Sequence, residues 1–198
     1  MIENLTKQNE ILLNLGKNKI DNLNENKKLY PLTNIVQFQK GFEVGSSKYS
    51  ETKNPGQINY IRVGDLKSLG NTFVDTLNNY TYADFEDILV AFDGAPGRNN
   101  IGLVGAYSSG IDKLICLNED KGLVFFEINS KINKQIIDIH TYGTTIKHAS
   151  KSINFLVYAN VDHKEKQILN WYFKQIIQNK KKINILKQIK ANLLNKYF

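Results

Sequence analysis

The chain has 198 residues, of which 41% are hydrophobic and 11% aromatic, so its composition excludes a disordered chain and allows one sizeable domain with appended elements. A single cysteine, Cys116, excludes a disulfide framework within the chain and favours a reducing, cytosolic setting. No apolar run approaches about 18 residues, and the N-terminal sequence lacks the order of a signal peptide. We therefore expect a cytoplasmic protein without a membrane partner.

The net charge of +7 indicates an anionic partner, with nucleic acid as the first candidate. A composition rich in Lys and Asn can also reflect codon bias, so the total charge leaves both interpretations open. Among the 26 basic residues, Arg62 and Arg98 are the two arginines, and both lie near glycine turns. Because arginine has a forked geometry that lysine cannot copy, these two residues are the most informative ones.

Residues 1–28 are predicted to form a helix, because apolar side chains recur at steps of three and four residues. Gly16 and the many asparagines weaken this pattern, and we expect a break or fraying near Gly16.

Residues 29–160 have the pattern of a mostly-β domain with a few short helices. Apolar runs rich in β-branched and aromatic residues alternate with clusters of Gly, Asn, Asp and Ser that are typical of turns. The predicted strands lie at 58–63, 87–92, 122–128 and 153–159, and the segment 117–122 is predicted to be a turn between two strands.

Residues 161–198 are predicted to form one long helix. Asp162 followed by Glu165 is the reciprocal pattern of a capping box. A helix of roughly 35 residues spans about 50 Å, too long to lie on one small domain. Its apolar seam follows a heptad spacing, in which polar residues at 179 and 190 would fix the register. The seam consists of Leu169, Tyr172, Ile176, Asn179, Ile183, Leu186, Lys190, Leu193 and Tyr197.

The predicted fold class is therefore α+β: one mostly-β domain between an N-terminal helix and a long, coiled-coil-like C-terminal helix. The first helix is the obvious packing partner of the last one. An ordinary helical hairpin packed on its own domain is the alternative.

Several kinds of catalytic site are missing from the sequence. The segment FDGAPGRNNIG at 92–102 matches neither a phosphate-binding P-loop nor a dinucleotide fingerprint. The histidines do not have the spacing of a helical zinc site, and no nucleophile elbow is present. Asp112, Glu119 and Lys121 imitate a nuclease metal site only loosely. We expect no catalysis by this chain alone, and no metal or cofactor of its own.

Four segments in order resemble the target recognition domain and spacer helix of type I restriction-modification specificity (S) subunits. These are GFEVGSSKYS at 41–50, INYIRVGDL at 58–66, YADFEDILVAFDGAPGRNNIGLV at 82–104, and the stretch from YGTTIKHAS at 142 into the last helix. The proline-rich entry to the spacer helix that is common in the family is missing from VYANVDHKEKQ. The resemblance covers about residues 30–198.

The resemblance implies a non-catalytic subunit that reads double-stranded DNA. Methylation (M) subunits would supply the methyl transfer to adenine, and restriction (R) subunits would cleave. One recognition domain flanked by one helix on each side resembles half of an S subunit. Such a half would form a homodimer through the long helices and read a bipartite palindrome, or it would pair with a different half.

The resemblance also implies that the segment 92–102 is a loop that faces DNA. Its glycines would permit positive φ and close approach, arginine would contact guanine and asparagine would contact adenine. Hydroxyl, amide and lysine groups in other loops would contact phosphates. A solvated loop or a structural turn is the alternative in each case, and for Arg62 an ion pair with Asp65. The predicted DNA-binding residues are Ser47, Lys48, Tyr49, Arg62, Gly97, Arg98, Asn99, Asn100, Tyr142, Thr144, Thr145, Lys147 and His148.

Two other functions stay open on the sequence. The chain could be a structural oligomerisation module whose basic charge is only compositional. It could also be the detached recognition part of a single-chain restriction enzyme with catalytic segments encoded upstream.

Overall fold

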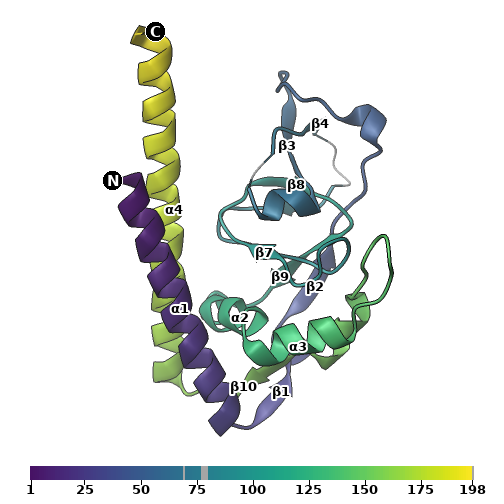
Figure 1. Ribbon diagram of the computed structural model, residues 1–198, viewed down its shortest axis with the longest axis vertical. Helices are drawn as coiled ribbons and strands as arrows, with labels where there is room; N and C mark the ends of the chain where they lie inside the picture. Colours follow the sequence, from purple (N-terminus) through teal and green to yellow (C-terminus); the bar gives the residue numbers. More distant parts are fainter. Residues whose placement is uncertain (69, 77–79, 198) are drawn as a thin grey trace.

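The computed structural model describes residues 1–68, 70–76 and 80–197. A helix, α1 (Ile2–Asn26), leads into a sheet-rich domain, and a long helix, α4 (His163–Tyr197), follows it. Figure 1 shows the two helices side by side, with the domain on one side of the pair. The fold class is α+β, as the change from helical to strand-like apolar spacing predicts.

The two helices run in opposite directions. Lys27 Nζ lies 3.3 Å from Glu165 Oε2, and further along the pair Asn179 Nδ2 donates to Asn9 Oδ1 at 3.0 Å. Asn179 is buried, so this amide pair fixes how the helices align. α4 continues well beyond the N-terminal end of α1 (Figure 1).

The expected break at Gly16 is wrong, because α1 is continuous from Ile2 to Asn26. Gly16 is buried, and a Cβ atom added to it would lie 2.1 Å from Cε1 of Phe126. The glycine therefore gives the aromatic ring room against the helix backbone. This packing offsets the low helix propensity that prompted the expectation.

The predicted capping box begins α4. Glu165 N donates to Asp162 Oδ1 at 2.8 Å, and Asp162 N donates to Glu165 Oε2 at 2.9 Å. The seam is buried at Leu169 and Ile176 but exposed at Lys190, where α4 has passed the end of α1. Phe198 and the side chain of Tyr197 lie outside the described residues. No helix in the described ranges is long and apolar enough to cross a membrane.

The strands of the described residues form three sheets. The small antiparallel sheet pairs β1 (Leu29–Pro31) with β10 (Val157–Ala159), which brings the two helix connections together. The second sheet has the order β2 (Gln37–Lys40), β9 (Ile111–Ile115), β6 (Ile88–Ala91) and β7 (Asn99–Asn100), all antiparallel. The third has the order β4 (Phe73–Asp75), β3 (Gln57–Ile61), β8 (Gly105–Tyr107) and β5 (Tyr82–Ala83), with β3 and β8 parallel. Short 3₁₀ helices are η1 (Leu32–Asn34), η2 (Ser46–Lys48), η3 (Val63–Leu66) and η4 (Ser150–Phe155).

The predicted strand at 122–128 is a helix, α2 (Lys121–Ile128), followed by α3 (Lys131–Ile139). The segment 117–122 consequently connects a strand to a helix and does not join two strands. Every residue of α2 after Lys121 is buried, and a segment that is buried on all sides shows no alternation of apolar and polar faces at the helical period. The predicted strand at 153–159 is strand only in β10, after η4.

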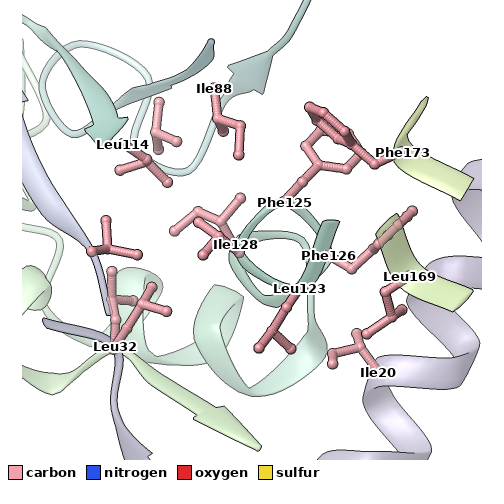
Figure 2. Packing of buried hydrophobic residues seen from close by; sticks show 14 of the residues in the cluster. Ile20, Leu32, Ile88, Leu114, Leu123, Phe125, Phe126, Ile128, Leu169 and Phe173 are labelled. Atoms are coloured by element: carbon pink, nitrogen blue, oxygen red, sulfur yellow. The ribbon is translucent and has the colours of Figure 1, made fainter. Parts of the chain in front are cut away.

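α2 is the centre of the main core and joins the domain to the helix pair. Phe125 packs edge-on against Phe173 of α4, with ring centroids 5.5 Å apart. Phe126 packs against Tyr172 of α4, with ring centroids 6.3 Å apart. Figure 2 shows Phe125 beside Phe173. Ile20 of α1 is fully buried in the same cluster. The sheet-rich domain is therefore held to the helices through aromatic packing.

A buried carboxyl group reinforces the same junction. Glu127 is fully buried and accepts from Ala159 N at 2.7 Å and from Asn24 Nδ2 at 2.9 Å. Asn133 of α3 donates to the carbonyl oxygen of Glu127 at 2.9 Å. Burial raises the pKa of Glu127 to about 7, although the bonds from Ala159 and Asn24 oppose that rise. One side chain thus connects α1, α2 and β10.

Candidate nucleic-acid interface

The four segments that contain most of the predicted DNA-binding residues are linked by direct contacts. The Arg62 guanidinium lies over the Tyr49 ring, 5.9 Å from its centroid, which links the segment 46–49 to the turn after β3. Arg98 Nη1 donates to Val63 O at 3.4 Å, which links that turn to the 92–102 loop. Residues far apart in sequence therefore meet on one surface. We call this surface, which carries Tyr49, Arg62 and Arg98, the loop face.

The fourth segment, 141–148, is attached to the 92–102 loop. Gly94 N donates to Lys147 O at 2.7 Å, and His148 Nδ1 lies 2.8 Å from Asp93 Oδ1. Tyr142 and His148 exchange both backbone hydrogen bonds, which closes the loop between them. The tip of this loop is exposed and carries hydroxyl and lysine side chains; its exposed residues are Tyr142, Gly143, Thr144, Thr145, Ile146 and Lys147.

The glycines of the 92–102 loop have the predicted conformation. Gly94 and Gly97 have φ values of +77° and +78°, a region that favours glycine. Arg98 N donates to Ala95 O at 3.0 Å, and Gly97 N donates to Ala91 O at 2.9 Å. These bonds close a tight turn that leaves the Arg98 side chain exposed.

Asn99 and Asn100 follow Arg98 in sequence, but their amides make hydrogen bonds within the chain. Asn99 and Asn129 exchange side-chain hydrogen bonds at 3.2 and 3.0 Å. Asn100 Nδ2 donates to Leu66 O at 2.9 Å, and its Oδ1 accepts from Lys180 Nζ at 2.7 Å. Both residues belong to β7, so pairing with β6 also holds their backbone. These bonds already occupy the groups that would read adenine.

Arg62 lies directly after β3 and is exposed, whereas the sequence places it inside a strand. The alternative of an ion pair with Asp65 is not found among the described residues. Asp65 Oδ2 instead accepts from the backbone N of Arg62 at 2.8 Å and fixes the start of η3. The Arg62 guanidinium is thus available on the loop face, beside Tyr49.

A charged cluster at the edge of the loop face was missed by the sequence reasoning. Asp93 Oδ2 lies 3.3 Å from Lys40 Nζ, while its other oxygen contacts His148. Asp112 interacts electrostatically with both Lys40 and Asp93. Burial raises the pKa of Asp112 to about 6; the charge of Lys40 opposes this rise and the charge of Asp93 adds to it. The signal in the sequence was an Asp followed by Gly in a turn. That signal does not reveal which partners the carboxylate will find.

Of the loosely nuclease-like residues, Asp112 lies in the charged cluster, and Lys121 begins α2 and donates to Glu86 O at 3.3 Å. In the part of the chain that the structure describes, no group of three or more His, Cys, Asp or Glu side chains could hold a metal ion. The remaining predicted residues, Ser47 and Lys48, are exposed on η2. The arrangement offers cations and hydroxyls for contact with an anionic surface.

Comparison with solved structures finds chains with a similar fold. A type I restriction-modification S subunit from M. genitalium aligns with 17% identity and a TM-score of 0.63, over 100% of this chain and 56% of that one. The HsdS subunit from Thermoanaerobacter tengcongensis aligns with 13% identity and a TM-score of 0.57, over 98% and 52%. A chain from a study of complex assembly and conformational transition in the type I R-M system aligns with 13% identity and a TM-score of 0.59. That alignment covers 98% of this chain and 49% of the other one.

The chain therefore has a fold similar to about half of each of these solved chains, and it spans about half of their length. No protein-family model matches the sequence. A search of curated proteins also finds no match.

Proposed function

We propose that this chain is the DNA-reading subunit of a type I restriction-modification system. It would direct adenine methylation, and restriction where an R subunit is present, by partner subunits that supply the catalysis. The observation that carries the proposal is the loop face, on which Arg62, Arg98 and the 142–148 loop meet within an S-subunit fold. As a DNA-reading subunit the chain would act in the cytoplasm, which is consistent with the finding that no described helix could span a membrane.

The two exposed arginines are assigned to the base edges. An arginine fork matches the two acceptors of guanine in the major groove, and each such contact discriminates by about 1–3 kcal/mol. Arg98 projects from a turn closed by glycines at positive φ, and Arg62 is steadied by the Tyr49 ring. Reading adenine with Asn99 or Asn100 would break their internal bonds, so these two are assigned to holding the loop.

The remaining loop residues are assigned to the phosphate backbone. Lysines and hydroxyls give affinity that does not depend on sequence and falls with salt. Gly97, with a φ of +78°, would hold the turn that presents Arg98 to the duplex. The residues in this group are Ser47, Lys48, Tyr49, Tyr142, Thr144, Thr145, Lys147 and His148.

A second copy of the chain would complete a full S subunit as a homodimer through the long helices. Support comes from the C-terminal part of α4, where Ile185, Ile189 and Leu193 are each about half exposed. Apolar side chains at this spacing are typical of a helix that packs on another helix. Two such halves related by a two-fold axis would read a bipartite palindrome.

The test is a selection of random DNA duplexes by the chain in complex with its methylation subunits. Wild type should enrich one motif, with affinity that falls steeply as salt rises. Arg98→Ala should relax the preference at one base pair by roughly tenfold to a hundredfold, the equivalent of about 1–3 kcal/mol. Lys7→Ala, which removes a charge from α1, is the matched control and should keep the motif.

Unchanged sequence preference in Arg98→Ala would remove the loop assignment. Binding that is absent, or insensitive to salt, in an assembled complex would favour the structural oligomerisation module. In the homodimer, light scattering should give twice the chain mass.

A further inference from the structure

A cavity of about 560 Å³ lies between the helix pair and the recognition domain. Its walls come from α1, α4, the segment 99–103 and the end of α2. Leu13, Phe125 and Ile176 supply apolar surface, while lysines and asparagine amides supply most of the rest. The volume is within the usual range for small-molecule sites.

Lys180 of α4 is held in this cavity by the recognition domain. Its Nζ donates to Asn100 Oδ1 at 2.7 Å and to Ile101 O at 2.8 Å. Gly102 has no side chain, and a Cβ there would lie 2.9 Å from Lys180 Cδ, so the glycine permits the close approach. An ammonium group has three hydrogen-bond donors, and the two neutral acceptors leave one N–H for a ligand.

Lysines outnumber acidic residues in the lining that the structure describes. Lys67 and Lys187 line the cavity with Lys180, and none of the three forms an ion pair with a carboxylate among the described residues. Burial, together with the nearby charge of Lys187, lowers the pKa of Lys180 to about 8. Glu10 is the acidic residue of the lining. A bound anion would relieve the cost of a partly buried charge without a counterion.

From these observations we infer that the cavity binds a phosphate group, with Lys180 and Lys187 as its cationic ligands and the apolar wall as the seat for a nucleotide-sized remainder. Amides such as those of Asn99 and Asn184 complete a lining suited to polar edges. The phosphate can belong to a free nucleotide or to a DNA backbone. The inference does not depend on the proposed function.

The experiment measures binding of inorganic pyrophosphate and of AMP to the full chain at pH 7 by calorimetry. Wild type should bind with a dissociation constant below about 1 mM. Lys180→Met should weaken binding at least tenfold. Lys181→Met is the matched control, because Lys181 is the next residue on α4 but bonds to Glu86 at 2.8 Å and does not line the cavity. Lys187→Met, on the exposed side of the lining, gives an independent variant if Lys180→Met does not fold.

Wild-type affinity should also fall between pH 7 and pH 9, as Lys180 loses its proton. If the cavity binds a free nucleotide, duplex DNA should not compete with AMP. If it binds a phosphate of the DNA backbone, duplex DNA should compete with AMP, and Lys180→Met should bind DNA more weakly than wild type. No binding of either probe to folded wild type would overturn the inference. Equal binding by wild type, Lys180→Met and Lys187→Met would overturn it as well.

Discussion

Replacing Gly16 by alanine sets two effects of known sign against each other. In a helix interior, Gly→Ala gains about 1 kcal/mol of helix propensity. The new Cβ, however, would lie 2.1, 2.3 and 2.5 Å from three carbons of the Phe126 ring, where ordinary carbon contacts are about 3.5–4.0 Å. The ring must therefore move by more than about 1 Å.

The ring has little room for that movement. Phe126 is fully buried, and it packs against Phe125 with centroids 5.1 Å apart and against Tyr172 at 6.3 Å. Overpacking a core costs about 1–3 kcal/mol, and contacts this short belong at the upper end. After the gain in propensity, Gly16→Ala should lower the free energy of unfolding by about 2 kcal/mol.

Urea denaturation followed by circular dichroism measures the change. Asn18→Ala, at an exposed position on the same helix, is the control and should stabilise by a few tenths of a kcal/mol. Adding Phe126→Leu to Gly16→Ala should recover part of the loss, visible as a coupling between the two changes. If Gly16→Ala stabilises the protein as Asn18→Ala does, α1 does not pack on α2 as described.

Two further predictions concern titratable groups of the helix junctions. The pKa of Glu127 is about 7 in the fold, above its ordinary value of 4.5, so its stabilising contribution is complete below pH 4.5 and is lost as pH rises through 7. At about 1.4 kcal/mol per pKa unit, the free energy of unfolding of the wild type should fall by about 3 kcal/mol over this range relative to that of Glu127→Gln. Urea denaturation of both proteins at several pH values measures this difference. The same pH dependence in both proteins would contradict the burial of the carboxyl group. At the start of α4, Asp162→Ala should lower the melting temperature, whereas Asp162→Asn, an equally good helix cap, should leave it unchanged; equal losses in both variants would rule out the capping role.

The sequence predicts the two long helices better than the short elements between them, for a physical reason. α4 is amphipathic and begins with a capping box, so local spacing and local hydrogen bonds define it. α2 is buried on all sides, and its period cannot separate a helix from a buried strand. Gly16 misled the prediction because its compensation comes from Phe126, more than a hundred residues later.

The candidate site could be predicted only in part for the same reason. Exposed loops with arginine, lysine and hydroxyl groups are visible in the sequence. Their meeting through Val63 and Asp93, and the inward bonds of Asn99 and Asn100, depend on long-range contacts that no local pattern encodes. The Lys180 cavity arises where α4 passes the segment after Asn100, and only the folded chain shows it.

The central claim is that this chain selects the DNA sequence that partner subunits methylate. The most direct measurement is a genome-wide map of adenine methylation in cells that co-express the chain with its methylation subunits. We predict new methylation at one split, palindromic motif, read by two copies of the same recognition domain. Absence of new methylation in a complex that demonstrably assembles would contradict the claim. An asymmetric split motif would contradict the homodimer and point to pairing with a different half.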